Sequence, residues 1–440
     1  MDAVTVAGHF KDKIIFITGS TGFLGKILLE KIDTEASTRC EEGLPPGLES
    51  SKILELSKEI DIIVNGAATT NFYERYDVAL ASNVLGTKYV CKFANKCPNL
   101  KMLLHVSTAY VARELQGLLL EKPFQISEMI KQGCHLDIDA ELKLVDSIKA
   151  DLMHSSGNSE QLEKKTMKKL GLKRARHFGW ANTYVFTKAM GEMLLEHFTG
   201  DLPVVVVRPS MVTSIYHDPL PGWIEGTRTI DTIIAAYAKQ TIPRFIGHGD
   251  VILDVIPGDM VVNAMVAAMA IHWNEKGQVV IHVTSSLQNP LSTATTLDIM
   301  YRYFSTNPQM GKNGRVIKAK RLLLTHKFEC FQTYMFLKYK LPLEVRPLRH
   351  QELILQIYCG CKTYVLWCIT LTMCPRSDKQ MLHLVNPLLG GSFSRYYNKL
   401  NRSYKYFILL AKLYAPYGFF NARFDDTNLS MLQTSTSGDP

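Results

Sequence analysis

The sequence predicts an α/β fold in which a doubly wound parallel sheet is followed by a helical domain. First, Ile14–Thr18 is a short β-branched run that breaks into closely spaced glycines and resumes at helical spacing, as a buried strand, a turn and a helix would. Second, three more apolar runs end in small or hydroxyl residues: 60–68 (IDIIVNGAA), 101–110 (KMLLHVSTAY) and 202–210 (LPVVVVRPS). Third, beyond about residue 318 basic, aromatic and apolar residues alternate at helical spacing.

The size and composition of the chain indicate a globular protein with two domains. Its 440 residues are 46% hydrophobic and 21% charged, which is enough apolar content to bury a substantial core and too much for a disordered chain. We place the boundary where the composition changes, so that residues 1–317 form one domain and residues 318–440 form a helical second domain.

The charge and cysteine content restrict the partners of the protein. The formal net charge of +9 comes from Lys and Arg spread along the chain, so we expect no nucleic-acid groove and expect instead a polyphosphate ligand or an anionic membrane surface. The nine cysteines lack zinc spacing, so we expect reduced thiols and no metal site. The N-terminus lacks a basic segment followed by an apolar core, which predicts an intracellular protein.

The glycines after the first strand have the spacing of a dinucleotide-binding turn. Gly19 permits the tight turn, Gly22 lets the backbone approach a pyrophosphate, and Gly25 lets the helix lie close to the strand. The N–H groups and the dipole of the helix then face the phosphates. The Gly-x-x-Gly-x-x-Gly spacing is the variant used by short-chain dehydrogenases, although a tight turn in any α/β domain also explains a bare triplet of glycines.

Two of the following strands end where a ligand would lie. The run 60–68 ends in small residues, as a strand must where its backbone passes beside a nicotinamide ribose. In open α/β sheets ligands lie beyond the carboxyl ends of the strands, and Ser107 and Thr108 stand at such an end. By themselves, hydroxyls at a strand end more often cap a turn.

Tyr184 and Lys188 are four residues apart, so on a helix both side chains emerge from one face. A phenol with its ordinary pKa near 10 donates a proton only weakly at neutral pH, and a neighbouring ammonium lowers that pKa. A Tyr-x-x-x-Lys spacing occurs often by chance. Here it follows a glycine loop and a Ser-Thr strand end in the order that proton transfer beside a nucleotide requires.

The remaining segments predict supporting structure. Residues 121–176 are polar and helical in pattern, as an insertion over the active site would be. Residues 261–271 predict a packing helix and residues 279–283 a short strand. Residues 353–373 are mostly apolar, but Lys362 interrupts them, which favours a buried or interfacial helix over a membrane span.

Four motifs together resemble the plant alcohol-forming fatty acyl-CoA reductases, also called male-sterility-type proteins. They are 18–26 (TGSTGFLGK), 67–72 (AATTNF), 105–110 (HVSTAY) and 182–192 (NTYVFTKAMGE). The resemblance covers most of residues 8–32 and 59–345 and resumes over 395–432, where 424–428 (FDDTN) is similar to a C-terminal signature of the family. It implies a Rossmann-type, extended short-chain dehydrogenase domain, a C-terminal helical domain, and NADPH-dependent reduction of a long-chain acyl-CoA to a primary alcohol with release of coenzyme A.

The resemblance also implies roles for individual residues. Thr108, with Ser107 as the alternative, would hydrogen-bond the substrate carbonyl; Tyr184 would protonate it, and Lys188 would bind the ribose and lower the Tyr184 pKa. Two hydride steps would give first an aldehyde, with loss of the coenzyme A thiolate, and then the alcohol used in wax, cutin, suberin or pollen-wall lipids. The implied cofactor-binding residues are Thr18, Gly19, Thr21, Gly22, Phe23, Leu24, Gly25, Ala67, Asn83, Ser107 and Lys188.

Two segments depart from the family pattern. Residues 33–58 are much shorter than in the family and contain no apolar run suitable for a strand. We therefore expect the strand beside the first one to be missing, which leaves an unpaired edge and no wall for the adenosine ribose. Arg39 is a weak substitute for a residue that reads the 2′-phosphate, so weak NADPH affinity and little discrimination against NADH follow. Residues 346–394 also differ from the family.

Other functions are compatible with the same residues. One is another extended dehydrogenase, such as a dihydroflavonol-type reductase or an epimerase; another is a catalytically impaired paralogue that binds lipid or a partner. The loop 23–26 (FLGK) and the C-terminal FDD favour the acyl-CoA reductase. The basic and aromatic C-terminal segments indicate peripheral membrane association, which predicts a location at the endoplasmic reticulum surface or in the cytoplasm.

Overall fold

The computed structural model divides the chain into two compact units. The first comprises Met1–Thr241, Gly249–Ala319 and Phe420–Pro440, and the second Ile242–His248 and Lys320–Phe419. The chain therefore returns to the first unit at its C-terminal end, which the predicted division into 1–317 and 318–440 did not include. The structure describes residues 6, 8–35, 39–42, 50–112, 116–123, 136–156, 160–226, 230–242, 244–311, 313–340 and 392–437.

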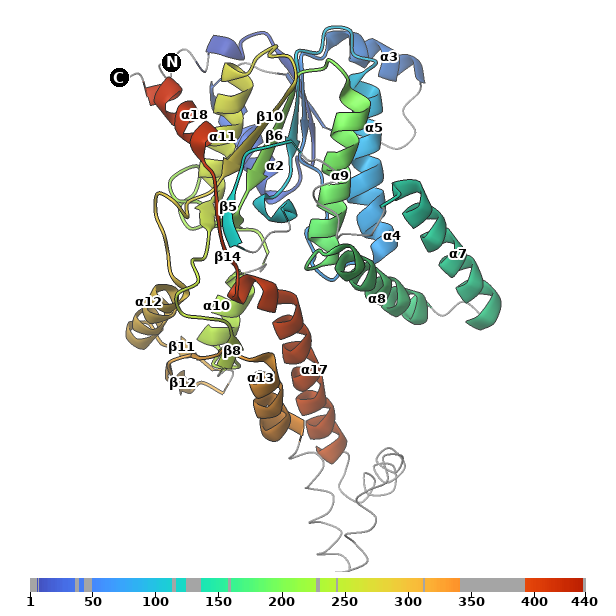
Figure 1. The fold of residues 1–440 in the computed structure, drawn as a ribbon. Helices are drawn as coiled ribbons and strands as arrows, with labels where there is room; N and C mark the ends of the chain where they lie inside the picture. Colours follow the sequence, from blue (N-terminus) through green and yellow to red (C-terminus); the bar gives the residue numbers. More distant parts are fainter. Residues whose placement is uncertain are drawn as a thin grey trace, which may run out of the picture. The chain divides into compact units, whose positions relative to one another are not determined.

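A six-stranded sheet forms the centre of the first unit (Figure 1). Its order is β10-β6-β4-β3-β1-β2, and every neighbouring pair is parallel. The chain runs outward from β1 to β2, crosses back to β3 and continues outward through β4, β6 and β10, so the predicted doubly wound sheet is confirmed. The strands are β1 (Ile14–Thr18), β2 (Arg39–Glu42), β3 (Ile62–Asn65), β4 (Met102–Val106), β6 (Val204–Pro209) and β10 (Gln278–Val283).

The strands alternate between two apolar layers, one on each face of the sheet. In β4, Leu104 belongs to the layer that includes Met265, whereas Leu103 belongs to the layer that includes Phe93. All of these side chains are buried. Burial on both faces explains why the strands read as continuous apolar runs rather than alternating ones.

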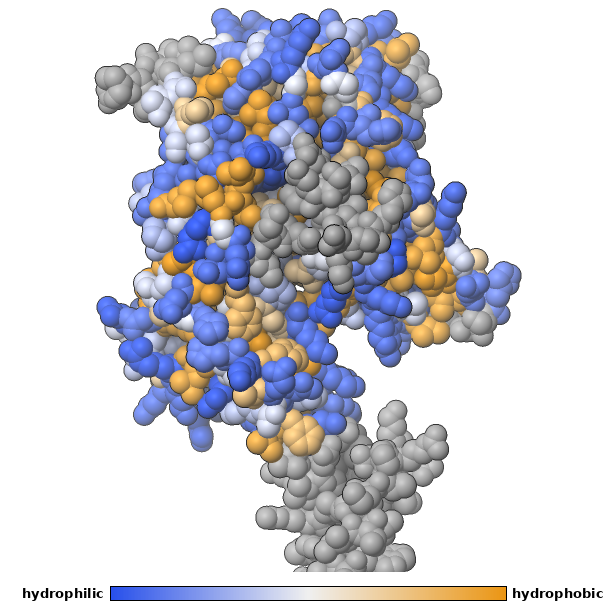
Figure 2. Space-filling model, in the orientation of Figure 1, coloured by the Kyte–Doolittle hydropathy of each residue, from blue (hydrophilic) through white to orange (hydrophobic). Residues whose placement is uncertain are grey.

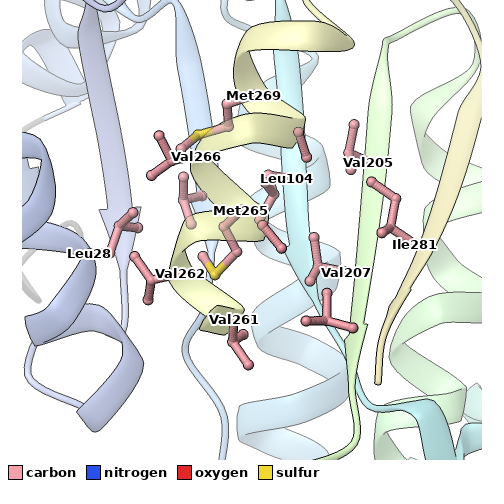
Figure 3. Close-up of a cluster of buried hydrophobic side chains, with 14 of the residues drawn as sticks. Leu28, Leu104, Val205, Val207, Val261, Val262, Met265, Val266, Met269 and Ile281 are labelled. Carbon is pink, nitrogen blue, oxygen red and sulfur yellow. The ribbon is translucent and has the colours of Figure 1, made fainter. Parts of the chain in front are cut away.

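Helices cover both faces (Figure 1). One layer contains α2 (Phe23–Glu35), α11 (Gly258–Ile271) and α18 (Thr427–Ser437); the other contains α3 (Ser50–Glu59), α5 (Gly86–Ala94) and α9 (Thr183–Thr199). Figure 3 shows how α11 lays one apolar stripe on the sheet. Val262, Met265, Val266 and Met269 recur at helical spacing along it, so the predicted packing helix is confirmed.

The prediction that no strand follows the first helix is wrong. Arg39–Glu42 forms β2, which pairs in parallel with β1 and sets Ile14 beside Arg39 and Ile17 beside Glu42. An edge strand is held by backbone hydrogen bonds to one neighbour, so the residues RCEE form it without the apolar run that we required. In the part of the chain that the structure describes, β2 rather than β1 is therefore the edge of this sheet.

The C-terminal signature docks on the first unit. Strand β14 (Asn421–Phe424) pairs in parallel with β5 (Gln116–Leu119). The Glu121 carboxylate accepts hydrogen bonds from the backbone N–H groups of His282 and Asn428, each at 2.7 Å. Because Asn428 lies in the first turn of α18, this carboxylate meets unpaired N–H groups and the positive end of the helix dipole. Burial raises the pKa of Glu121 to about 7.

Within the predicted insertion 121–176, the described residues form the helices α7 (Ile138–Ser156) and α8 (Glu160–Phe178), in agreement with the helical pattern. The position of this insertion over the active site stays a prediction. The strand predicted at residues 279–283 is β10. The other elements of the first unit are α4 (Tyr76–Ala79), the π-helix η1 (Leu80–Leu85), the 3₁₀ helix η2 (Ala109–Val111), β7 (Met211–Thr213), α10 (Ile230–Ala238), β9 (Val255–Pro257), α12 (Thr293–Thr306), β11 (Gln309–Met310) and β12 (Val316–Ile317).

The second unit is mainly helical. Helix α17 packs against α13 and the π-helix η3, and β13 pairs in parallel with β8. Residues 353–373 lie outside the described residues, as do most of 346–394; among the helices that are described, none is long and apolar enough to cross a membrane. The elements are β8 (Arg244–Ile246), β13 (Leu323–Thr325), α13 (Phe328–Met335), η3 (Phe336–Lys340) and α17 (Ser392–Gly418).

Truncating the core of the sheet tests this packing. Leu104 is fully buried in β4, so Leu104→Ala removes apolar contacts and leaves a cavity that costs about 2–5 kcal/mol of unfolding free energy. The matched control is Leu54→Ala on α3, because Leu54 is 57% exposed. Urea unfolding of the two variants measures the difference. Equal midpoints would contradict the central position assigned to Leu104.

Candidate functional site

The glycine loop is built from contacts that admit no side chain. A Cβ at Gly25 would lie 2.2 Å from Gly19 O, and a Cβ at Gly19 would lie 2.6 Å from the nitrogen of Ala67. Gly19 also has a φ of 82°, in the left-handed region that glycine adopts without strain. The sequence-based roles of Gly19 and Gly25, a tight turn and a close helix, therefore correspond to real contacts.

The start of α2 fits the pyrophosphate of a dinucleotide. The Gly22 N–H donates to Gly19 O at 3.0 Å, and α2 begins at Phe23. The first N–H groups of a helix have no partner within it, and the dipole favours an anion there. The backbone from Thr21 to Leu24 supplies this surface, whereas the Phe23 ring packs edge-on against Trp223, with 5.3 Å between ring centroids.

The ends of β1 and β3 are joined beside this loop. Thr18 Oγ1 donates to Asn65 Oδ1 at 2.9 Å and accepts from the Ala67 N–H at 3.3 Å. Gly66 N–H donates to Thr18 O at 3.1 Å. The small residues that end the run 60–68, just after β3, thus lie where the backbone passes the glycine loop. Three of the predicted cofactor-binding residues, Thr18, Gly19 and Ala67, lie together there.

Two hydroxyls stand at the end of β4. Ser107 Oγ is buried and has no hydrogen-bond partner among the described residues. Thr108 caps η2: its Oγ1 accepts from Tyr110 N–H at 3.5 Å and donates to Pro209 O at 3.4 Å. Because both bonds of Thr108 are long, its hydroxyl is able to turn toward a carbonyl oxygen.

Helix α9 presents Tyr184 and Lys188 to this strand end. Asn182 caps the helix by accepting from Val185 N–H at 3.0 Å, and Tyr184 lies in the first turn, its ring stacked on Phe72 at 6.0 Å between centroids. Lys188 Nζ donates to Val106 O at 2.7 Å. This bond brings the helix that carries both predicted catalytic residues against the strand that ends in Ser107 and Thr108.

Lys188 is almost entirely buried, with 2% of its surface exposed. Burial lowers the pKa of its ammonium to about 8, and the nearby Glu192 carboxylate partly opposes that shift. The group therefore changes charge close to physiological pH, as expected of a group that acts in proton transfer. Glu192 itself accepts a two-pronged hydrogen bond from the buried Arg208.

Asn83 supports the site from the opposite side. Its amide bonds the backbone N–H and C=O of Thr69, at 2.9 and 3.1 Å, and donates to Thr187 Oγ1 at 2.9 Å. It lies in the π-helix η1, and such irregular turns are frequent at functional sites. A Cβ at Gly191 would lie 2.6 Å from Asn83 O, so Gly191 lets α9 approach η1 closely. Asn83 thus fastens the loop after β3 to α9.

Sequence reasoning missed two buried polar residues. His105 Nδ1 lies 3.0 Å from Asn65 Nδ2, and His105 Nε2 lies 3.3 Å from Lys188 Nζ. Burial and the charges of Lys188 and Arg208 lower the pKa of His105 well below its ordinary value, so the imidazole is neutral. A signal was present, because a polar residue inside an apolar strand such as 102–106 requires a buried partner.

The arrangement provides the parts of a reductase site. A glycine loop leads into the N-terminus of α2, which favours an anion, two hydroxyls lie at a strand end, and a tyrosine and a lysine lie one turn apart on α9. Among the described residues no group of histidine, cysteine, aspartate and glutamate is arranged to hold a metal ion.

Comparison with known proteins agrees with this geometry. Residues 42–265 match the family model described as Male sterility protein. The chain is 39% identical over 381 residues to the Alcohol-forming fatty acyl-CoA reductase of Simmondsia chinensis, covering 86% of this chain and 70% of that one. It is 36% identical over 482 residues to Fatty acyl-CoA reductase 8 of Arabidopsis thaliana, covering 96% and 90%.

Among solved structures, the chain is similar to the terminal R domain from the myxalamid PKS-NRPS biosynthetic pathway. The identity is 19% and the TM-score 0.47, over 73% of this chain and 74% of that one. It is also similar to MoeE5 in complex with UDP-glucose and NAD, at 14% identity and a TM-score of 0.44, over 71% and 85%.

Proposed function

Because this chain belongs to the male-sterility-type family of fatty acyl-CoA reductases, we propose that it reduces a long-chain fatty acyl-CoA to a primary alcohol and releases coenzyme A. The observation that supports this most directly is the contact of α9 with the end of β4, made by Lys188 Nζ and Val106 O at 2.7 Å. It brings Tyr184, Lys188, Ser107 and Thr108 to one edge of the sheet.

The nicotinamide cofactor supplies hydride when it is bound. The backbone from Thr21 to Leu24 would hold its pyrophosphate, because the first N–H groups of α2, which begins at Phe23, have no partner within the helix and favour an anion. Lys188 would hold the ribose hydroxyls, and Ser107 Oγ, buried and unpartnered among the described residues, is a hydroxyl available beside them.

The protein's own residues handle the charge that develops on the substrate oxygen. Thr108 donates a hydrogen bond to this oxygen, and Tyr184 gives it a proton. Charged Lys188 lowers the pKa of the phenol and makes that proton easier to transfer. The first reduction ends with loss of the coenzyme A thiolate and leaves an aldehyde; the second gives the alcohol. Both steps develop negative charge on the same oxygen, so the same two residues serve both.

From the family resemblance we propose NADPH as the cofactor, and from the residues of β2 we expect weak NADPH affinity and little discrimination against NADH. In our proposal β2 borders the adenosine half of the cofactor. This strand begins at Arg39 and ends at Glu42. At about 3.3 Å per residue, Arg39 lies roughly 10 Å from the carboxyl end where the ribose is bound. An acidic residue near the end of this strand suits the 2′-hydroxyl of NADH better than the 2′-phosphate of NADPH.

Association with the surface of the endoplasmic reticulum membrane is a further part of the proposal. In η3 and α17, exposed Leu337 and Tyr406 occur beside Lys338 and Lys405. Figure 2 shows apolar side chains at the end of α13 among hydrophilic ones. Aromatic and apolar side chains flanked by lysines suit the interface of an anionic bilayer, into which a long-chain alcohol would partition.

Replacing the proton donor tests the catalytic assignment. Tyr184→Phe keeps the ring that stacks on Phe72 and removes the proton, so turnover of a C16 or C18 acyl-CoA should fall about 10²–10⁴-fold while NADPH affinity is nearly unchanged. Lys188→Ala should lower both turnover and affinity. Equal turnover of Tyr184→Phe and the unchanged protein would refute the role of Tyr184.

Nucleotide selectivity tests the role of β2. Fluorescence titration of the purified chain should give weak NADPH binding, within about tenfold of that of NADH, because no basic residue stands at the end of this strand. Glu42→Arg should shift the preference toward NADPH, whereas Glu55→Arg on α3, the matched charge change, should not. A strong preference of the unchanged chain for NADPH would show that another residue reads the 2′-phosphate.

Flotation with lipid vesicles tests the membrane proposal. The protein should float with vesicles of phosphatidylcholine and phosphatidylserine at low salt and partly dissociate at about 0.5 M salt, because the attraction of lysines to the surface is screened. Leu337→Glu should weaken flotation, and Leu54→Glu on α3 is the matched control. Full recovery of the unchanged protein in the soluble fraction at low salt would count against membrane association.

A further inference from the structure

A buried line of polar side chains joins the glycine loop to Lys188. It runs from Thr18 Oγ1 to Asn65 at 2.9 Å, from Asn65 to His105 at 3.0 Å and from His105 to Lys188 Nζ at 3.3 Å. Asn65, His105 and Lys188 are each no more than 3% exposed. The line crosses the ends of β1, β3 and β4 and reaches α9. It therefore connects the loop proposed to hold the pyrophosphate with the lysine proposed to hold the ribose.

The direction of these hydrogen bonds depends on the charge of Lys188. An ammonium has three donors and no acceptor, so beside charged Lys188 the His105 Nε2 atom must accept. The imidazole hydrogen then lies on Nδ1 and needs an acceptor, which is the Asn65 amide oxygen. Beside neutral Lys188 the opposite direction holds: Nε2–H donates to Nζ, and the Asn65 amide nitrogen donates to Nδ1.

The line is able to reverse without other movement. The two ends of an amide have nearly the same shape, so turning over the Asn65 amide exchanges its donor and acceptor in place. Thr18 Oγ1 both donates and accepts and therefore suits either arrangement. The His105 tautomer changes with the amide. The imidazole stays neutral in both arrangements, in keeping with its strongly lowered pKa.

We propose that His105 and Asn65 are positioning residues which hold Lys188 toward the cofactor ribose and support both of its charge states by reversing the direction of their hydrogen bonds. The proposal rests on the proposed function, since Lys188 must be charged to assist Tyr184. His105 touches neither substrate nor cofactor, and it acts through Lys188. Thr18 Oγ1 is hydrogen-bonded to Asn65, so the end of β1, which leads into the glycine loop, belongs to the same line of hydrogen bonds.

Two further ionisable groups, Glu192 and Arg208, act on Lys188 and His105. Glu192, one turn along α9, favours the charged form of Lys188. Arg208 on β6 disfavours a charge on His105 and is itself bound by Glu192. Lys188, whose pKa is about 8, is charged below that pH and neutral above it. We therefore expect kcat/KM for reduction to decline as the pH rises through this range.

Two substitutions should shift the pH at which kcat/KM declines, in opposite directions. His105→Leu removes the partner of both charge states of Lys188, but the bond lost by the charged form is the stronger one, so the decline should shift about one pH unit lower, with a loss of kcat that exceeds any change in the acyl-CoA KM. In Asn65→Asp the carboxylate offers only hydrogen-bond acceptors, so the His105 hydrogen stays on Nδ1 and Nε2 is left to accept from Lys188. This favours charged Lys188, and the decline of kcat/KM should shift about one pH unit higher. His105→Gln retains an acceptor and should restore most of the unchanged profile.

Cofactor binding provides a readout besides activity. The dissociation constant of NADPH, measured by fluorescence titration between pH 6 and 9, should weaken above the same shifted pH in each variant, because only charged Lys188 attracts the nucleotide strongly. His282→Gln is the matched control. His282 is a buried histidine at the end of β10, 3.3 Å from Arg208 and with its other ring nitrogen at Asp425 O, and its loss should leave the pH dependence unmoved.

The outcomes separate this inference from the proposed function. If His105→Leu and Asn65→Asp fold, as thermal unfolding would show, and both keep the pH dependence of the unchanged protein, the inference is overturned. If the unchanged protein reduces no acyl-CoA with either nucleotide, the proposed function fails, and the binding titrations still decide whether His105 and Asn65 act on Lys188. Opposite shifts are not expected from loss of stability alone.

Discussion

Burying the Lys188 ammonium is the constraint on which the rest of the site depends. A charge removed from water costs several kcal/mol unless hydrogen bonds and an opposite charge replace the solvent. The replacements here come from three residues on two elements: Val106 O and His105 on β4, and Glu192 on α9, the helix that carries Lys188. Each of these groups must be placed relative to the Lys188 ammonium to within about a few tenths of an ångström. The close approach of α9 to η1, which Gly191 permits, holds the helix at that distance.

The sheet supplies this accuracy because its strand ends are in register. Thr18 pairs with Asn65, and Asn65 pairs with His105, so consecutive ends lie side by side at the carboxyl edge. In parallel sheets paired residues point to the same face, and polar side chains there form one continuous line. The same register brings the glycine loop after β1 against Gly66 and Ala67. The glycine loop and the residues that we propose for proton transfer therefore lie at one edge of one sheet.

The family membership and the geometry support each other in separate ways. The relatives are fatty acyl-CoA reductases by name, one of them alcohol-forming, and the chain has the tyrosine, the lysine and the strand-end hydroxyls to which we assign this chemistry. The departures from the family do not fall on these residues. They fall on the segment around β2, which bounds the adenosine half, and on residues 346–394, most of which lie outside the described part of the chain. The proposed effect of the first departure is on nucleotide affinity and selectivity, since the residues that we propose to transfer the proton, Tyr184 and Lys188, lie outside this segment.

The sequence by itself determined the fold class, the glycine loop and the spacing of Tyr184 and Lys188 on one helix, because these follow from local features: apolar runs, glycine spacing and a four-residue helical repeat. The tertiary structure decided the rest. It placed β2, whose polar residues carry no strand signal because an edge strand is held by its backbone alone. It returned 420–437 to the first unit through β14 and Glu121. It also joined Asn65 and His105 to Lys188, a contact between residues 40 and 83 positions apart that only the pairing of strand ends brings about.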